Sequence, residues 1–425
     1  MNRRHARRQG MIALALTGAM IALAGCAPEP DVQPTPTPTD SAVVPYDGPV
    51  VFVGDELESF LLTPAEVAEA IPEATGVMNA SAVLEQVSDG GGTAAVPAIC
   101  DALFAEQSLG SVGARVTRWM TPSDPEYGQG RVEVLQFADE QQARDRMDQL
   151  LQAAADCGQF TKEAPVTFDA EILDEVDGVR AFAGTLLDID GGYDWRVFQA
   201  YAAVGNVVVM LNQPFTGDRT YDAQAAASLL QQRAGDARDA LVADLTENPP
   251  VPEEQPVTDA AQPWSEWAIG VDGVGPVLLG DAVDVAVAAA GGTATPPTFD
   301  RGPWIVENPE ATASMLIQQA EDAETVWYVT VGTRRGESAE TPQDGAALPA
   351  LGDVRVGMPV SEAFAALPGG TIVDVASSGE DYYAVTTREG RLFRFDTEGD
   401  AADGTAIIIG ITVEDATQRA SLRFG

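Results

Sequence analysis

The feature that most constrains the fold is an internal repeat in the C-terminal half of the chain. Residues 273–286 align with residues 350–363, 77 positions later, and both runs are rich in glycine and aliphatic residues. Each run leads into a predicted helix that ends in paired glycines, which suit left-handed C-terminal caps. The pairs are residues 291–292 and 369–370, and predicted strands follow at 304–307, 315–319 and 326–331, and at 382–386, 391–395 and 407–413. The repeat predicts two units, each made of a strand, a helix and a meander and each burying one sheet face.

The start of each unit also carries a family resemblance. The Gly-Pro-aliphatic-Gly run before the first predicted helix, within residues 273–286, is similar to the small helix-plus-sheet repeats of the outer-membrane assembly lipoprotein family. It also resembles the repeats of β-lactamase inhibitor proteins. Those folds bind other proteins through a concave or edge surface, so the resemblance implies an interaction domain.

Aromatic side chains in the predicted strands of the repeats allow two interpretations. Core packing is one, because aromatic residues are good strand formers that bury large areas. A protein-binding face is the other, with Trp327, Tyr382 and Tyr383 as candidates. Since consecutive strand residues point to opposite faces, Tyr382 and Tyr383 cannot share one face. We therefore expect one of these two tyrosines to lie on the outside.

A linker separates the repeats from the preceding sequence. Residues 246–263 hold five prolines among acidic residues, without apolar periodicity. Such a segment predicts a domain boundary between residues 50–245 and residues 264–425. We expect the linker to hold the two domains apart and each domain to fold independently.

The N-terminus predicts export. Residues 1–10 carry four arginines and no acid, and an apolar run follows that is shorter than a membrane-spanning helix. The run ends in Leu-Ala-Gly before Cys26, which resembles the lipobox of bacterial lipoproteins. The resemblance implies a signal peptide over residues 1–25 and a diacylglycerol, usually with palmitate, on Cys26. An ordinary secretory signal with a chance cysteine is the alternative. Residues 26–49, with their Pro-Thr repeats, are typical of a stiff extended spacer.

Residues 50–245 predict an antiparallel sheet with packed helices, an α+β fold. Thr63, Pro64 and Glu66 form a capping box for a short helix, and Asp139 with Gln142 begins a second helix. The second helix carries an apolar stripe along one side. The predicted strands are residues 112–119, 131–137, 178–187, 195–203 and 207–213, the last two joined by a Gly-Asn hairpin turn, and a third helix spans residues 222–245.

The order of these elements resembles the PknH-like extracellular sensor domain of actinobacteria. The likeness rests on residues 62–67 (Leu-Thr-Pro-Ala-Glu-Val), on residues 134–137 followed by the acid-capped helix that reaches Cys157, and on the paired late strands within 195–209. Members occur on serine/threonine kinases and as free-standing lipoproteins, and have a central cleft thought to take a ligand. They commonly carry two disulfides, whereas this domain can form only one.

Two cysteines remain after the lipidated one. Cys100 and Cys157 lie in an oxidising compartment if the chain is exported, where a disulfide is the expected state. A metal site or a nucleophilic cysteine is the alternative. Neither alternative has a histidine beside it, because the chain's one histidine, His5, lies in the signal region.

Charge excludes one class of partner. The chain has 24 Lys and Arg against 65 Asp and Glu, a net charge of −41, so we expect no binding to nucleic acid, which requires basic residues to neutralise phosphates. Motifs of nucleotide binding, zinc binding and serine hydrolysis are missing from the sequence. We therefore predict no enzymatic activity and no cofactor. An acid-dependent hydrolase built on two carboxylates stays as a third hypothesis.

One acidic segment is compatible with a cation site. Asp188, Asp190 and Asp194 surround a Gly-Gly pair, which is similar to part of a calcium loop. The later acidic positions of such a loop are missing, and the segment lies between two predicted strands. A plain turn is thus the preferred interpretation, and these three residues are weak metal candidates. Residues 396–404 are interpreted in the same way, as an acidic hairpin loop.

Together these patterns predict a non-enzymatic lipoprotein on the outer face of the cytoplasmic membrane, tethered through Cys26. Its partners would be the membrane, through the lipid, and an unknown envelope molecule. Ligand sensing or ligand binding by residues 50–245 is the first hypothesis. A protein-binding or inhibitor-like adaptor built on residues 264–425 is the alternative.

Overall fold

The computed structural model describes residues 45–86, 95–121, 128–190, 193–251, 259–298, 302–321, 324–334 and 343–419, without the side chains of residues 189, 190, 193 and 194. The predicted signal peptide, Cys26 and nearly all of the spacer lie outside these residues, so lipidation stays a prediction. Within the described ranges, no helix is long and apolar enough to cross a membrane.

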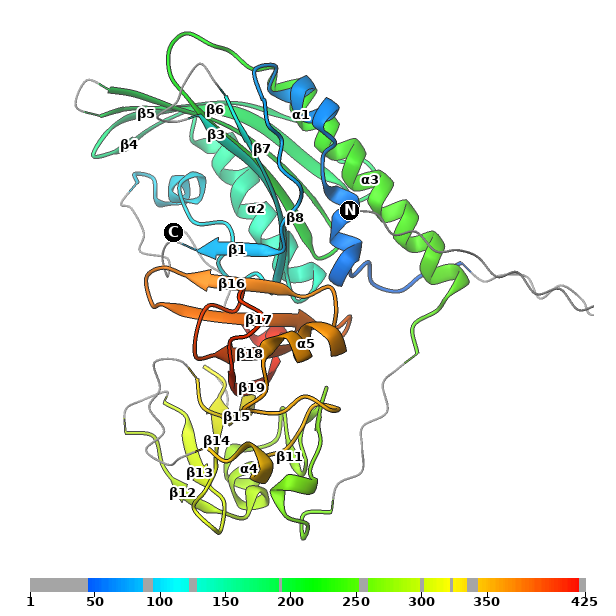
Figure 1. Cartoon of the computed structure of the whole chain (residues 1–425). Helices are drawn as coiled ribbons and strands as arrows, with labels where there is room; N and C mark the ends of the chain where they lie inside the picture. The colour runs from blue at the N-terminus through cyan, green and yellow to red at the C-terminus, as the bar shows by residue number, and fades with distance from the viewer. Residues whose placement is uncertain are drawn as a thin grey trace, which may run out of the picture. The chain divides into compact units, whose positions relative to one another are not determined.

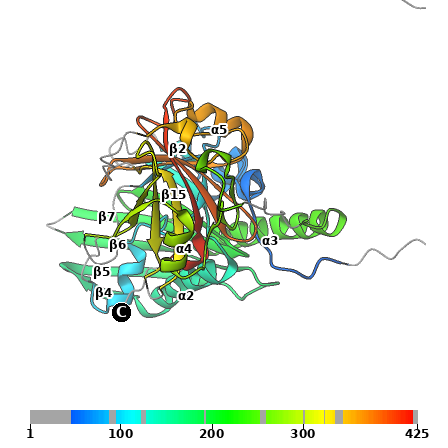
Figure 2. The ribbon, with the colours of Figure 1, turned by 90° about the horizontal axis from the view of Figure 1, so that it is seen from below.

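The fold is α+β, as predicted, and residues 50–245 are built on a seven-stranded antiparallel sheet (Figure 1). The strand order is β2-β3-β8-β7-β6-β5-β4, with β2 Gly113–Met120, β3 Gln129–Gln136, β4 Gln159–Lys162, β5 Ala164–Ile172, β6 Arg180–Asp190, β7 Tyr193–Val204 and β8 Val207–Phe215. The sequence predicted all of these except β4 and β5, whose mixed polar composition hides the alternation. Figure 2 shows the ends of β4 to β7 side by side, with α3 reaching out on the other side.

The α-helices of the N-terminal part begin where the sequence predicted, each after a capping residue. Thr63 and Glu66 form the capping box of α1 (Pro64–Ala70), and Asp139 accepts a hydrogen bond from the Gln142 amide at the start of α2 (Glu140–Asp156). The long helix α3 (Ala223–Glu247) is capped by Asp222. Two shorter 3-10 helices, η1 (Gly54–Phe60) and η2 (Ala98–Leu103), were not predicted, because each is little more than one or two turns long.

The two long helices cover opposite faces of this sheet. Leu230 and Leu241 of α3 share one apolar cluster with Val134 and Phe198 of the sheet. Met147 and Leu150 of α2 share a second apolar cluster with Phe182, Tyr201 and Val208. These three strand residues alternate along the sequence with the strand residues of the first cluster. Because consecutive strand residues point to opposite faces, both faces of the sheet are buried by helix packing.

The C-terminal half forms the predicted repeat. Each copy is a short helix, α4 (Val283–Ala290) or α5 (Val360–Ala366), followed by four antiparallel strands. The strands are β12 Thr293–Thr295, β13 Trp304–Glu307, β14 Ser314–Gln319 and β15 Val326–Gly332 in the first copy, and β16 Thr371–Val375, β17 Glu380–Thr386, β18 Arg391–Thr397 and β19 Ile408–Asp415 in the second. The first strand of each copy, β12 or β16, was not predicted.

The copies join through their last strands. β15 pairs antiparallel with β19, with Val331 opposite Ile411, so the two meanders form one continuous sheet. Helices α4 and α5 pack on one face of this sheet, where they share an apolar cluster with Val329, Phe395 and Val413 of the strands. The short strands β9 (Ile269–Gly270), β10 (Gly273–Val274) and β11 (Val277–Leu278) form a small sheet of their own.

One N-terminal segment connects the two large sheets. Residues 75–81 hydrogen-bond to the edge strand β2, and the Ser81 amide donates to the Val116 carbonyl at 2.8 Å. The next residues form β1 (Val83–Gln86), which pairs in parallel with β16 and becomes the ninth strand of the repeat sheet (Figure 1). Nothing in the local pattern of residues 75–86 distinguishes these two partners.

The linker does not hold the two parts apart as expected. Val112 and Ala138 share an apolar cluster with Val373, Tyr382 and other repeat residues, and the described residues belong to one compact unit. The expectation failed because the linker's composition carries no information on the surfaces it connects. The boundaries 50–245 and 264–425 still delimit the two sheets closely, except for β1. Whether each part folds alone stays a prediction.

Candidate functional site

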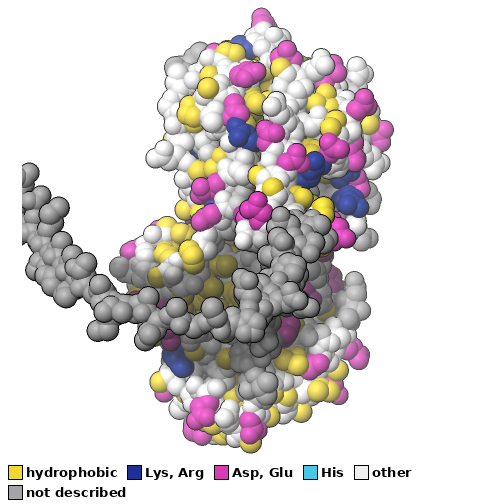
Figure 3. Space-filling model, turned by 90° about the vertical axis from the view of Figure 1, so that its right-hand side faces the viewer, with side chains coloured by type: hydrophobic (Ala, Val, Ile, Leu, Met, Phe, Trp, Pro, Cys, Tyr) yellow, Lys and Arg dark blue, Asp and Glu magenta, His cyan; other side chains and the backbone are white. Residues whose placement is uncertain are grey.

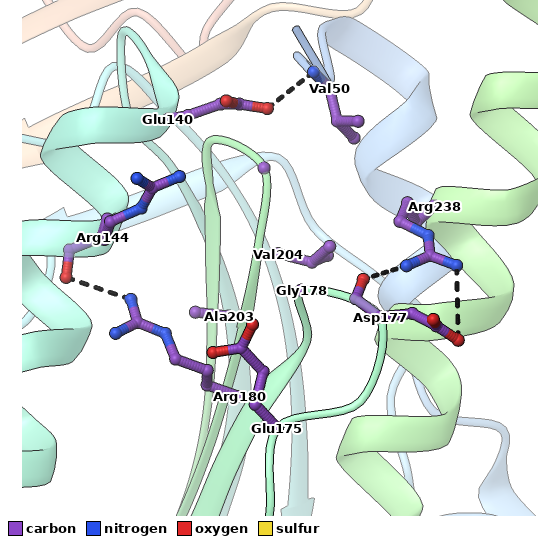
Figure 4. Close-up of a pocket in the computed structure, with 11 residues that line it drawn as sticks. Val50, Glu140, Arg144, Glu175, Asp177, Gly178, Arg180, Ala203, Val204 and Arg238 are labelled. Carbon is purple, nitrogen blue, oxygen red and sulfur yellow. Dashed lines mark hydrogen bonds and ion pairs between the residues drawn. The ribbon is translucent and has the colours of Figure 1, made fainter. Parts of the chain in front are cut away.

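A pocket of about 460 Å³ lies where β6 begins and the β7–β8 hairpin turns. Its walls come from α2, from the loop before β6, from the hairpin, from α3 and from the segment before η1 (Figure 4). The lining residues are Val50, Glu140, Arg144, Glu175, Asp177, Gly178, Arg180, Ala203, Val204, Gly205 and Arg238. Three of them are arginines, in a chain with 24 Lys and Arg among 425 residues. Among the residues in view in Figure 3, basic side chains are likewise few and acidic ones widespread.

The hairpin turn positions one wall of the pocket. Gly205 has a φ of +56°, and a Cβ at this residue would lie 2.1 Å from the Val50 carbonyl oxygen. Glycine is thus required both for the turn and for the close approach of Val50. The neighbouring Asn206 is fully buried, accepts a hydrogen bond from the Phe52 amide at 2.7 Å and donates to the Phe137 carbonyl at 2.8 Å. The Gly-Asn pair read as a hairpin signal therefore also holds the pocket's N-terminal segment.

Two of the three arginines are engaged by the protein itself. Arg180 forms an ion pair with Asp148 on α2 and donates to the Arg144 carbonyl at 3.2 Å. Arg238 donates to the Asp177 carbonyl and pairs with Asp239 at 2.6 Å. These contacts hold the guanidinium group of Arg180 against α2 and that of Arg238 against the loop before β6, so both groups are fixed before a ligand arrives.

Two charged side chains of the pocket differ from the others in their contacts. Within the part of the chain that the structure describes, the side chains of Arg144 and Glu175 make no hydrogen bond or ion pair, and both residues are exposed. The remaining acid of the α2 wall, Glu140, accepts the Val50 amide at 2.7 Å. The pocket therefore offers one open positive and one open negative group beside apolar contacts from Val50 and Val204.

The predicted disulfide is present. Cys100 and Cys157 are bonded, with their Cα atoms 5.8 Å apart, and the bridge ties η2 to the end of α2. Both cysteines are fully buried in the α2 cluster. The bridge therefore holds the helix that contributes Glu140 and Arg144 to the pocket.

The weak metal candidates lie at the far ends of two paired strands. Asp188 and Asp190 are in β6, Asp194 is in β7, and Asp190 is opposite Tyr193 in antiparallel register. The Gly-Gly pair of the turn interpretation, residues 191 and 192, lies outside the described residues. No group of three or more potential metal-ligating side chains occurs among the described residues, which do not include the side chains of Asp190 and Asp194. The metal hypothesis therefore stays untested.

The aromatic candidates for partner binding are mostly buried. Tyr382 and Tyr383 do point to opposite faces, but their exposed fractions are 9% and 4%. Tyr383 packs among Phe364 and Phe395 on the helical face, and Tyr382 packs in the cluster shared with Val112. The expectation that one of them lies outside was wrong, because the other part of the chain covers that face. Trp327 is half-buried and donates to the Asp415 carbonyl at 3.1 Å.

The interpretation of residue 396 as part of an acidic loop was also wrong. Strand β18 continues to Thr397, and Asp396 is fully buried, with its carboxylate 2.5 Å from the Arg394 guanidinium. Residues that are two positions apart on a strand lie on the same face of the sheet. This spacing is the signal that could have predicted the pair. The Arg394 guanidinium also lies 3.7 Å from the centroid of the Tyr382 ring. Burial lowers the pKa of Arg394, but Asp396, Tyr382 and Glu380 together raise it above its ordinary value.

Further charged pairs lie on the same face of the repeat sheet. Glu414 is held by Arg419 through contacts of 2.6 and 3.0 Å. Burial alone would raise the pKa of Glu414, but the attraction and hydrogen bonds of Arg419, together with the attraction of Arg334 and Arg394, lower it. Thr330 and Thr412 share a hydrogen bond of 2.7 Å across the β15–β19 pair. Sequence reasoning missed this set, because its members are far apart in the chain.

Arg115 and Arg388 are charged contacts between the two parts, and Arg388 of the repeats pairs with Glu56 of η1. The side chain of Arg115 is 3% exposed and donates to Asp55 at 3.0 Å and to the Gly369 carbonyl at 2.8 Å. Gly369, one of the paired glycines, has a φ of +82° and lies against Gly54. Arg115 therefore fixes η1 and the turn after α5 to the edge strand β2.

Comparison with solved structures gives a distant likeness. No family model matches the chain, and no curated protein matches it in sequence. The chain is similar to a solved structure, the extracellular domain of PknH from Mycobacterium tuberculosis, with 15% identity and a TM-score of 0.29. The match covers 47% of this chain and 98% of that chain. At this identity and TM-score, membership of the sensor-domain family stays a prediction.

Proposed function

We propose that this chain is a non-enzymatic lipoprotein of the bacterial envelope whose N-terminal part binds a small polar ligand. The observation that carries the proposal is the pocket between α2, α3 and the β7–β8 hairpin, where arginines gather in an otherwise acidic chain. Its volume of about 460 Å³ lies within the range of small-molecule sites.

The pocket is suited to polar rather than apolar ligands. Guanidinium groups recognise carboxylates and phosphates through paired hydrogen bonds, and two of the three here are held in place by Asp148, Asp177 and Asp239. A site that is built before the ligand arrives loses less conformational entropy on binding. Arg144 then supplies the group whose hydrogen-bonding capacity is still open.

A panel of small charged metabolites, screened against the mature chain by thermal unfolding, tests ligand binding. We expect at least one compound to raise the midpoint, and we expect Arg144→Gln to abolish that shift. Arg118→Gln is the matched control, because Arg118 lies on β2, away from the pocket, and pairs with Glu85 on β1. Equal shifts in the wild-type chain and in Arg144→Gln would place the ligand elsewhere and refute this pocket.

Anchoring through Cys26 is a separate part of the proposal. The supporting features are the basic and apolar segments before Cys26 and the Pro-Thr spacer after it. Several acyl chains on one residue give stable membrane attachment, whereas a single chain is marginal. Cys26→Ser should release the protein from the membrane fraction or leave it with its signal attached. A mature, membrane-bound Cys26→Ser protein would refute lipidation.

The aromatic surface that motivated the protein-binding alternative is mostly buried in the structure. Tyr382 and Tyr383 are buried within the chain, and only Trp327 of the three candidates is partly accessible. The hydrolase hypothesis rests on no specific pair of carboxylates. Ligand binding at the arginine pocket is therefore the function that the geometry supports best.

A further inference from the structure

Building on the proposed ligand site, we propose that the pocket recognises a zwitterion, namely an amino acid or short peptide with both a free ammonium and a free carboxylate. Arg144 would bind the carboxylate and Glu175 the ammonium. The two residues stand on different walls of the pocket, Arg144 on α2 and Glu175 on the loop before β6 (Figure 4).

The first argument is the distribution of partners among the charged lining residues. Arg180, Arg238 and Asp177 are engaged in ion pairs or hydrogen bonds with the protein, and Glu140 accepts a backbone amide. Arg144 and Glu175 are the two charged lining residues whose side chains lack a partner among the described residues. Since they have opposite signs, a ligand that satisfies both must carry both charges.

The second argument is the charge of the whole chain. With a net charge of −41, the protein repels free anions at long range and attracts cations to many surface positions. An anion bound by Arg144 alone would leave Glu175 of the same pocket unsatisfied, and a cation bound by Glu175 alone would leave Arg144 unsatisfied. A ligand with no net charge avoids the long-range repulsion and still uses both groups, so the pocket discriminates in its favour.

The third argument concerns the rest of the ligand. Val50, Ala203 and Val204 line the pocket beside its charged residues, and open space lies where a side chain of Gly178 would begin. Apolar contacts combined with a few fixed polar groups are typical of small-molecule sites. Such a surface suits the aliphatic part of an amino acid or peptide, which lies between its two charged ends.

The test compares dipeptides that differ only in their terminal charges. Isothermal titration of the mature chain would use a set of dipeptides with Ala, Leu or Phe side chains, their N-acetyl forms and their C-terminal amides. We expect at least one free dipeptide to bind, and we expect both blocked forms of that peptide to bind at least about tenfold more weakly. Absence of binding by every free dipeptide at millimolar concentration would overturn the proposal.

Two variants assign the termini. Arg144→Gln should weaken binding of the free dipeptide and leave the amide unchanged, and Glu175→Gln should weaken the free dipeptide and leave the N-acetyl form unchanged. Arg118→Gln should change neither. If the N-acetyl peptide binds as tightly as the free one and still needs Arg144, the pocket takes anions; the zwitterion inference then fails and the proposed function stands. If both variants bind the dipeptide like the wild-type chain, the inference and the pocket assignment fail together.

Discussion

The two large sheets of this chain stabilise their faces in different ways. The seven-stranded sheet is covered by helices on both faces, with apolar clusters on each side and a disulfide that ties η2 to α2. The repeat sheet has helices on one face, whereas its other face carries buried polar and charged residues such as Arg394, Asp396 and Glu414. On this face Arg394 pairs with Asp396, and Glu414 pairs with Arg419. In the N-terminal pocket, by contrast, Arg144 and Glu175 are left open, and an open group can bind something else.

A buried glutamate in each part shows the same contrast. Burial raises the pKa of Glu133 on β3, although Arg131 lies 2.9 Å away and acts in the opposite direction. The pKa of Glu414 is lowered despite complete burial, because Arg419 and further arginines surround it. The side chain of Arg131 is 46% exposed, whereas that of Arg419 is 18% exposed, and Arg334 and Arg394 add to the attraction on Glu414. The attraction of less exposed partners is screened less by water, so their combined effect decides the direction of the shift.

The largest effect is expected from breaking the buried pair of the repeat sheet. Arg394→Met leaves the carboxylate of Asp396 without its main partner in a fully buried position, and should lower the free energy of unfolding by about 3–5 kcal/mol. Denaturant unfolding would measure it. The double variant Arg394→Met with Asp396→Leu removes both charges and should be less destabilised than the single variant. A double variant that is worse than the single one would show that the pair itself stabilises the fold.

The second-largest loss of stability is expected from removing the disulfide. The bridge closes a loop of 57 residues, so replacing Cys100 and Cys157 by alanine should cost about 4 kcal/mol in the chain-entropy model. Hydrogen exchange should show the loss of protection mainly in η2 and α2, with less change in β17 to β19. Equal losses in both sheets would mean that the junction transmits the whole effect, and the contrast between the parts would then not extend to their stability.

A smaller and pH-dependent effect is expected for Glu414. Since its folded pKa is lowered, its contribution to stability is present above the unfolded value of about 4.3 and is lost as the pH falls through the folded pKa. Glu414→Gln should therefore cost about 1.5–3 kcal/mol at neutral pH, the range for hydrogen bonds to charged groups. The difference from the wild-type chain should shrink below pH 4. Glu362→Gln, at an exposed position on α5, is the control.

The opposite sign is expected for Glu133. With a raised folded pKa, its carboxylate opposes folding once the pH exceeds the unfolded value, and this penalty grows until the pH passes the folded pKa. Glu133→Gln should thus raise stability at neutral pH by up to about 1 kcal/mol, a usual size for a single favourable substitution. The gain should vanish in acid. A loss of stability at neutral pH would mean that the contact with Arg131 outweighs the cost of burial.

The success of sequence reasoning followed the range of the interactions. Capping by Thr63 and Asp139, the turn at Gly205 and the repeat were predicted, because each depends on neighbours in the sequence. The disulfide was predicted because few cysteines were available. The burial of Tyr382 and the pairing of β1 with β16 were not, since both depend on which distant surface packs there. The pocket was not predicted either, because its charged residues come from α2, the loop before β6 and α3, which are far apart in the sequence.

The smallest effect on stability is expected in the pocket itself. Arg144 is exposed and its side chain has no partner among the described residues, so Arg144→Gln should change the free energy of unfolding by less than about 0.5 kcal/mol. Arg180→Gln should cost more, because it removes the contacts with Asp148 and the Arg144 carbonyl, yet less than Arg394→Met, since exposed ion pairs contribute little. Denaturant unfolding of the three variants under one condition measures this order. If Arg144→Gln is as destabilising as Arg180→Gln, Arg144 has a structural role, and its side chain is not the open group that the proposed ligand site requires.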